Sequence, residues 1–241
     1  NTPKVLFASF ALAAVPLGLI VMQPDLSTTI VTTLIFVTLL FVAGLSYKIV
    51  AGVLSVSIPS AIILFTLLIQ DKIPFIRQYQ LTRIMAWLYP EDYPADAYQQ
   101  QNAIMAIGSG QLWGKGLNNT DATSVKNGNF IPEPQTDFIF AVAGEELGFI
   151  GTAIIIILLL FVTIECILIA RKARDTAGKM ICCGFAALVG FQSLVNIGVA
   201  SGLLPNTGIP LPFVSYGLTS LLSLYIGVGL VLNVGLQKKK Y

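Results

Sequence analysis

Six long apolar runs limit what this chain can fold into more than any other feature. They are residues Val5–Met22, Leu26–Ala43, Ile49–Ile69, Phe138–Ala170, Met180–Leu204 and Pro212–Leu236. As a helix, each is long enough to cross a hydrocarbon core of about 30 Å, which takes ~20 residues. Backbone groups in lipid must pair internally, and no two-residue alternation is visible, so helices are expected rather than strands. We predict an all-α, polytopic membrane domain over residues 1–241 with about six transmembrane helices.

The composition excludes a soluble globular domain and narrows the available chemistry. Of 241 residues, 55% are hydrophobic and 11% are charged, and the mean hydropathy is +0.80. The sequence holds no histidine, so a histidine base, a histidine metal ligand and a Ser-His-Asp triad are excluded for this stretch. Cys166, Cys182 and Cys183 show neither metal-ligand nor disulfide spacing. Acid–base chemistry would therefore fall to aspartate and glutamate.

The basic residues predict the orientation of the chain in the membrane. If the N-terminus is cytoplasmic, nine of the fourteen Lys and Arg lie on the inner side, as the positive-inside rule requires. The other five lie in one long outer loop, residues 70–136. Three polar segments rich in Pro or Gly, residues 23–27, 70–136 and 202–217, then share the extracytoplasmic face. We expect the functional site on that face.

Four acidic residues at or within apolar runs have two interpretations each. Asp25 and Asp137 each precede a run, so each is either a helix N-cap or a functional carboxylate in a wet cavity. If a helix begins at Asp137, Glu145 lies ~12 Å deeper and about 80° round the helix, so it is expected to share a cavity with Asp137. Glu146 points to nearly the opposite face and is expected to pair with another helix. Either glutamate could instead form a buried structural ion pair, because a charge exposed to lipid is costly.

The long loop is expected to contain two short amphipathic helices, Phe75–Leu88 and Asp96–Gly110, lying at the interface. In the first, the basic side chains Arg77 and Arg83 would face water and contact either headgroups or a pyrophosphate. Five apolar or aromatic side chains would face lipid: Ile76, Tyr79, Ile84, Trp87 and Leu88. The segment "GSGQLWGKGL" fails as a nucleotide phosphate loop because Ser109 stands where a glycine is needed. We interpret it as a flexible turn that carries Lys115.

Residues 202–217 combine three prolines and three glycines between two spans. Irregular backbone at membrane depth is tolerated only where it is buried in protein or lines a water-filled cavity. We therefore expect a cavity wall here, with Ser215 and Tyr216 available as hydrogen-bonding groups. A tight hairpin is the alternative.

Four stretches together resemble the SEDS family, which includes RodA, FtsW and SpoVE. In order, they are "QPDLSTT", "GSGQLWGKGL", "IPEPQTDFIFAVAGEELGFIG" and "GLLPNTGIPLPFVSYGLTSLL". The resemblance runs from about Val5 to the C-terminus. Members usually have ten spans, so it implies that this chain is the later part of a ten-helix fold. The start at Asn1 rather than methionine also leads us to expect a fragment.

The resemblance implies a peptidoglycan glycosyltransferase of the bacterial cell membrane, acting in elongation, division or sporulation from the extracytoplasmic side. Such an enzyme polymerises lipid II with inversion, and undecaprenyl pyrophosphate leaves. It implies that Asp137, in "TDFIF", is catalytic and that Asp25 matches the family's other important aspartate. Gln135 departs from the pattern, since many members have histidine there. Residues expected to bind substrate are Asp25, Arg77, Arg83, Lys115, Glu133, Glu145, Ser215 and Tyr216.

The chemistry of an inverting transfer agrees with these assignments. The acceptor hydroxyl needs a base, and a half-desolvated carboxylate with a raised pKa can serve. The leaving pyrophosphate needs cations, for which Arg77, Arg83 and Lys115 are candidates. A divalent cation such as Mg²⁺ would help, although no metal-ligand set is readable.

Expected partners are membrane lipids and, from the resemblance, a class B penicillin-binding protein transpeptidase; no nucleic-acid partner is expected. Two other functions stay open. A transporter (flippase) of a lipid-linked cell-wall precursor would also use intramembrane acids and proline-broken helices. A scaffold would pack a partner helix on small residues such as Gly144 and Gly148.

Overall fold

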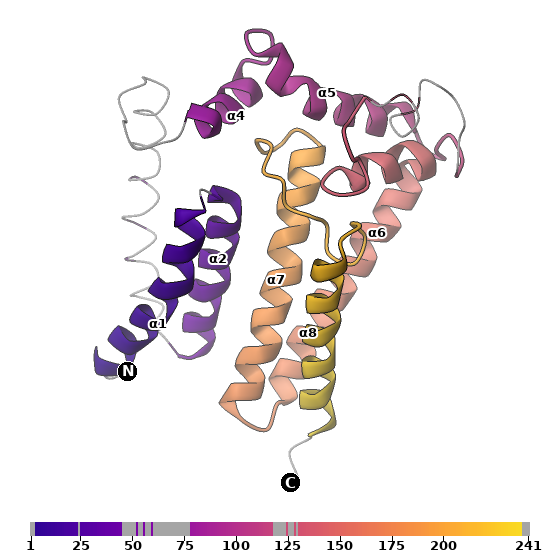
Figure 1. Ribbon diagram of the computed structural model, residues 1–241. Helices are drawn as coiled ribbons and strands as arrows, with labels where there is room; N and C mark the ends of the chain where they lie inside the picture. The colour runs from indigo at the N-terminus through magenta and orange to yellow at the C-terminus, as the bar shows by residue number, and fades with distance from the viewer. Residues whose placement is uncertain are drawn as a thin grey trace.

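The computed structural model describes residues 3–23, 25–44, 78–117 and 130–237, together with residues 52, 55, 59, 124 and 128 (Figure 1). This described part holds seven α-helices and no strand, which confirms the all-α prediction. The helices are α1 (Pro3–Met22), α2 (Leu26–Val42), α4 (Gln78–Leu88), α5 (Pro94–Ser109), α6 (Ile139–Lys172), α7 (Thr176–Ala200) and α8 (Leu218–Leu236). Most of the expected third span, Ile49–Ile69, and the candidate Arg77 lie outside the described residues.

The long helices form a bundle, and α4 and α5 lie across one end of it (Figure 1). Helix α7 is central and packs against α2, α6 and α8, while α1 packs against α2. Helices α6, α7 and α8 are each long and apolar enough to cross a membrane. The apolar stretches Ala11–Met22 of α1 and Ser27–Val42 of α2 are shorter. The chain is thus a multi-pass membrane protein.

The outer surface of the bundle exposes many large apolar side chains. Small side chains such as Ala186 and Val189 of α7 are buried, which lets neighbouring helices approach closely. Large apolar side chains such as Phe161 of α6 and Leu232 of α8 are exposed. A helix that is hydrophobic all round has no face for water, so these exposed side chains are placed to contact lipid or another apolar surface.

Helix α4 forms within one of the two expected amphipathic helices but corrects the direction of Trp87. The indole nitrogen of Trp87 donates a hydrogen bond to the carbonyl of Gly202, at 2.8 Å. Tyr79 and Ile84 line a polar pocket beneath the helix. The prediction that Trp87 faces lipid was therefore wrong, because its indole nitrogen is bonded to the loop after α7; for Tyr79 and Ile84 it stays a prediction.

Helix α5 is held against the bundle rather than lying freely at the interface. The side-chain amide of Gln100 donates to the carbonyls of Val199 and Leu204, at 2.8 and 2.7 Å. Ala103 and Ala106 are buried, and the helix packs along α6. The Val199 carbonyl lies in the last turn of α7 and also accepts from the N–H of Gly202 at 3.1 Å, whereas the Leu204 carbonyl lies in the loop after the helix. Gln100 satisfies them and thereby fixes the start of the loop that follows α7.

The segment 111–116, predicted to be a flexible turn, is instead fastened to a kink in α6. At Gly148, φ is 66° and ψ is −165°, so the helix is interrupted there. Four backbone hydrogen bonds then join the two segments: Lys115 N to Glu145 O (2.8 Å), Gly116 N to Glu146 O (3.1 Å), Phe149 N to Gln111 O (2.8 Å) and Ile150 N to Leu112 O (3.2 Å). The segment satisfies backbone groups that the kink leaves unpaired. We call residues 111–116 and 145–150 the α6 joint.

Candidate functional site

A polar pocket of about 390 Å³ opens beneath α4, between the start of α2 and the loop after α7. Its polar lining includes Asp25 from the start of α2, Gln80 and Arg83 from α4, and Asn206 and Thr207 from the loop. The guanidinium carbon of Arg83 lies 5.7 Å from the centre of the Tyr79 ring, a cation–π contact that orients the charge. The pocket therefore joins two of the predicted site residues, Asp25 and Arg83.

Asp137 reaches the same region from the other side of the loop. A Cβ on Gly208, which lines the pocket, would lie 3.4 Å from the Oδ2 atom of Asp137. Burial raises the pKa of the Asp137 carboxyl above its usual value, and the nearby charge of Arg83 partly opposes this rise. The half-buried carboxylate, the cation and the pocket wall thus lie together, as the sequence predicted for Asp137 and Arg83.

The two aspartates differ in their capping roles. Asp25 caps α2, since its Oδ1 accepts from the backbone N–H of Thr28 at 3.0 Å. The N-cap of α6 is Phe138, with no side-chain capping bond, so the capping interpretation of Asp137 is wrong. The carboxylate of Asp137 makes no capping hydrogen bond to α6 and lies beside Gly208 in the pocket wall. Asp25 both caps its helix and lines the pocket.

Two buried side chains hold the backbone that carries Asp137. The amide of Asn196, on α7, donates to the carbonyls of Asp137 and Ile209, each at 2.7 Å. The hydroxyl of Ser215 donates to the carbonyl of Thr136 at 2.6 Å, and it accepts from the N–H of Leu211 at 2.7 Å. The prediction that Ser215 is available to substrate was wrong, because its one hydrogen is used in this clamp.

Tyr216 and Glu133 do not line the polar pocket. The side chain of Tyr216 is 70% exposed, and its backbone N–H donates to the carbonyl of Gln135 at 2.9 Å. Glu133 is exposed on the turn before Asp137, with a positive φ of 46°, and its carbonyl accepts from the N–H of Thr136. Both residues shape the loop around Asp137, but the structure does not bring their side chains to the pocket.

Lys115 and Glu145 lie together in a second, smaller cavity of about 200 Å³. The Nζ atom of Lys115 lies 2.8 Å from Oε1 of Glu145, whose side chain is only 2% exposed. The hydroxyl of Ser124 donates to the other carboxylate oxygen at 3.3 Å. The expectation that Glu145 shares a cavity with Asp137 was therefore wrong, and the ion-pair alternative is confirmed. The expected pyrophosphate role of Lys115 is not supported, because its charge is matched by Glu145.

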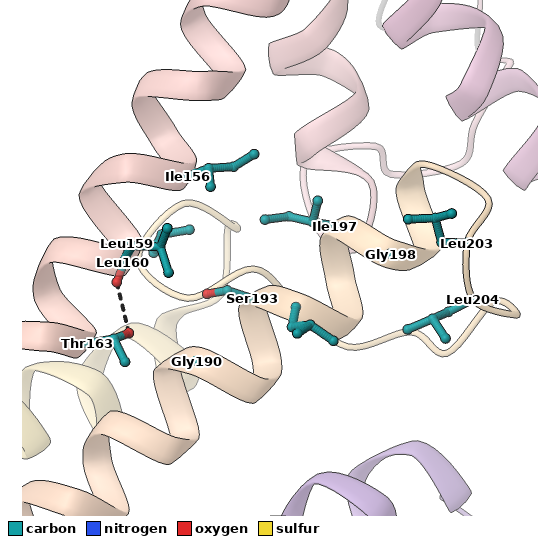
Figure 2. Close-up of a pocket in the computed structure, with 11 residues that line it drawn as sticks. Ile156, Leu159, Leu160, Thr163, Gly190, Ser193, Ile197, Gly198, Leu203 and Leu204 are labelled. Carbon is teal, nitrogen blue, oxygen red and sulfur yellow. Dashed lines mark hydrogen bonds between the residues drawn. The ribbon is translucent and has the colours of Figure 1, made fainter. Parts of the chain in front are cut away.

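A larger apolar groove of about 480 Å³ runs between α6 and α7 (Figure 2). Figure 2 shows Leu159, Ile197 and Leu204 around it, and the Thr163 hydroxyl bonded back to the carbonyl of Leu159 at 2.9 Å. Its described lining residues include no titratable side chain, so the groove offers no acid–base chemistry. The polar pocket is the better candidate for catalysis.

Sequence reasoning missed Asn196, Asn206, Thr207 and Gln80. Asn196 had a usable signal, because an amide in an otherwise apolar helix must find hydrogen-bond partners away from lipid. Asn206 and Thr207 lie within a segment that was predicted to line a cavity, but no pattern singled them out. Their side chains reach the pocket only because α7 ends at Ala200 and the loop returns over it.

A sequence profile of the cell cycle protein family of FtsW, RodA and SpoVE matches residues 1–240. The chain therefore belongs to this family, the SEDS family. The peptidoglycan glycosyltransferase MrdB of Escherichia coli is 37% identical over 233 residues, which cover 96% of this chain and 60% of that protein. The probable peptidoglycan glycosyltransferase FtsW of Nitrosomonas europaea is 36% identical over 225 residues, which cover 92% of this chain and 55% of that protein.

Solved structures agree with this assignment. A chain from a structure described as "Structural coordination of polymerization and crosslinking by a peptidoglycan synthase complex" aligns with a TM-score of 0.71 and 28% identity, covering 97% of this chain and 62% of that chain. The rod shape determining protein RodA of Thermus thermophilus aligns with a TM-score of 0.59 and 25% identity, covering 100% of this chain and 59% of that one. The chain spans 55–60% of the length of the two curated relatives above.

Proposed function

We propose that the protein is a peptidoglycan glycosyltransferase that polymerises lipid II into glycan strands. The observation that carries the proposal is the half-buried Asp137 carboxylate at the wall of a polar pocket that also holds Arg83. The names of the relatives MrdB and FtsW support the same reaction class.

In the proposed reaction, Asp137 acts as the general base. The 4-hydroxyl of the acceptor sugar gives its proton to the carboxylate, and its oxygen forms a bond to the anomeric carbon of the donor. The bond from that carbon to the pyrophosphate breaks, and undecaprenyl pyrophosphate leaves with both electrons, so the configuration inverts. A raised pKa suits Asp137 to this role, because a base with a pKa nearer the working pH accepts the proton more readily.

Arg83 is placed to neutralise the leaving group. Its guanidinium can contact two phosphate oxygens at once, which a lysine cannot do with the same geometry. Asn206 and Thr207 supply neutral hydrogen-bonding groups on the opposite wall of the pocket. Asp25 lines the pocket from the start of α2, where it would accept hydrogen bonds from sugar hydroxyls.

We place the site on the extracytoplasmic side. The last turn of α6 carries Arg171 and Lys172, and this end of the helix lies away from α4 and α5 (Figure 1). The positive-inside rule makes that end cytoplasmic, which leaves the polar pocket on the outer side.

A divalent cation such as Mg²⁺ fits the pocket only as a companion of the substrate. Among the described residues, no group of three or more Cys, Asp or Glu is placed to hold a metal ion. Mg²⁺ commonly keeps several waters and binds one or two carboxylates together with substrate phosphates. Asp25, which lines the pocket, is the carboxylate that would hold it, and it would neutralise charge on the pyrophosphate.

The proposal is tested with the full-length protein, purified and supplied with lipid II, by following polymer formation on a gel. We expect polymer from the parent protein and almost none from Asp137→Asn. The matched control is Glu91→Gln, an exposed acid on the turn between α4 and α5, which should keep parent activity. An Asp137→Asn variant as active as the parent would refute the base assignment.

A liposome assay separates this proposal from transport. Movement of lipid II across the bilayer without glycan product would favour a flippase. A class B penicillin-binding protein remains the proposed partner, supported by the similar chain from a peptidoglycan synthase complex. Co-purification of the two proteins from membranes checks that partnership.

A further inference from the structure

The α6 joint divides α6 into a short part and a long part. The short part, residues 139–147, follows directly after Asp137, and the long part after Gly148 crosses the membrane. Asp137 therefore lies at one end of the short part, and Glu145 lies near its other end. Because the short part is helical, its orientation at the joint contributes, together with the Asn196 and Ser215 hydrogen bonds, to where the Asp137 carboxylate lies relative to the polar pocket.

Glycines let the joint close tightly. A Cβ on Gly114 would collide with the carbonyl oxygen of Glu146, and a Cβ on Gly148 would collide with the backbone nitrogen of Gly114. Both glycines also have positive φ, 78° and 66°, where other residues are strained. The backbone contacts thus bring residues 111–116 against α6 at a close and defined distance.

The Lys115–Glu145 ion pair adds a directional side-chain contact at the same place. The Nζ–Oε1 distance is 2.8 Å, and the lysine side chain is 28% exposed whereas the glutamate side chain is 2% exposed. Removing the lysine would take the cation at 2.8 Å away from a buried carboxylate, an unfavourable change that favours movement of the glutamate. The ion pair therefore holds the end of the short part against residues 111–116.

The pair does not share the polar pocket. Its cavity is lined by residues of α5, the α6 joint and Phe130, and it has no lining residue in common with the pocket that holds Asp25 and Arg83. The ion pair is therefore not expected to contact the substrate groups that Arg83 contacts.

We propose that Lys115 and Glu145 are positioning residues for the glycosyl transfer. They hold the short part of α6, and through it Asp137, in the orientation that directs the carboxylate at the pocket. The activity readout of this inference rests on the proposed function, whereas the joint itself can be tested without it.

The kinetic test compares Lys115→Met with Lys115→Arg in the full-length protein. The methionine variant should lose about tenfold to a hundredfold in kcat, because a small misplacement of a catalytic group carries a penalty of that order. Its KM for lipid II should stay within about twofold, since the pocket lining is unchanged. The arginine variant, which keeps the cation, should retain most of the parent kcat.

A double variant separates positioning from simple stability. Lys115→Met with Glu145→Gln removes both charges, so thermal stability should return toward the parent while kcat stays low. Parent-like kcat per folded molecule in Lys115→Met would overturn the proposal. So would a raised KM with unchanged kcat, because that result would indicate a substrate contact.

Hydrogen exchange tests the joint independently of catalysis. The amides of Phe149 and Ile150 donate to residues 111 and 112, and they should exchange faster in Lys115→Met than in the parent. Unchanged exchange at these amides would overturn the inference even if the protein polymerises lipid II. Active Asp137→Asn would instead refute the base assignment and leave the exchange result standing.

Discussion

Replacing Asn196 with leucine should destabilise the loop that carries Asp137. The amide of Asn196 is 1% exposed and donates to two carbonyls, those of Asp137 and Ile209, each at 2.7 Å. Leucine branches at the same carbon as asparagine but is larger and has no donor, so both carbonyls lose this partner. A buried polar group that loses its partner costs about 1–3 kcal/mol, which gives a range of roughly 2–6 kcal/mol for the pair.

Two details of the site favour the lower end of that range. The Oδ1 atom of Asn196 is buried with no hydrogen-bond partner among the described residues, so leucine also removes one unfavourable group. Leucine is more apolar than asparagine, which suits a buried position in a spanning helix. We therefore expect a loss of about 2–3 kcal/mol in the free energy of unfolding.

The assay is thermal unfolding of the purified protein in detergent, combined with the lipid II polymerisation rate. The matched control is Ser193→Ala on the same helix, because the Ser193 hydroxyl is buried without a hydrogen-bond partner in the described part of the chain. The control should unfold at or slightly above the parent temperature. If Asn196→Leu unfolds with the parent and keeps parent activity, the reasoning that this amide holds the Asp137 segment is refuted.

Three further predictions follow from the pocket and its clamp. Activity should rise with pH through the raised pKa of Asp137, because the base must be deprotonated. Arg83→Gln removes the charge that lowers this pKa, so the rise in activity should move to higher pH. A rise at the parent pH would contradict the assignment. Ser215→Ala removes the donor to the Thr136 carbonyl and should lower the stability measured by thermal unfolding by about 1–3 kcal/mol, whereas parent stability would argue against the clamp. Gly208→Val forces a β-branched residue to a φ of 72° beside the Asp137 carboxylate, so it should reduce polymerisation and lower the free energy of unfolding by about 1–3 kcal/mol. A fully active variant would show that Gly208 is not close to the Asp137 carboxylate.

The sequence predicts the spanning helices α6, α7 and α8 well, because their apolar runs are long and local. It places their ends less well, since the ends depend on partners far along the chain. Helix α7 ends at Ala200 rather than Leu204, because Gln100 and Trp87 donate to the Leu204 and Gly202 carbonyls of the following loop. Helix α8 begins at Leu218 rather than Pro212, because the preceding residues are held by Ser215.

The candidate site also combines residues that local sequence patterns identify with residues that they do not. Asp137 and Asp25 could be singled out because a charge beside an apolar run is unusual and the family resemblance points to both. Arg83 is one of several basic candidates in the long loop, and the structure places it at the pocket. The Lys115–Glu145 pair could not be singled out, because its members are thirty residues apart and meet only through the α6 joint. The regular-helix assumption placed Glu145 relative to Asp137, but α6 begins at Ile139 and Glu145 turns toward residues 111–116. Long-range pairing of this kind leaves no periodic pattern in the sequence.

The most direct test of the central claim is the single-turnover release of undecaprenyl pyrophosphate from lipid II by the full-length protein and its Asp137→Asn variant. Asparagine keeps the size of the side chain and removes its ability to take a proton, so we predict a loss of about a hundredfold to ten-thousandfold in the rate with a parent-like unfolding temperature. Release by the folded variant at the parent rate would show that the Asp137 carboxylate does not accept the proton of the acceptor hydroxyl.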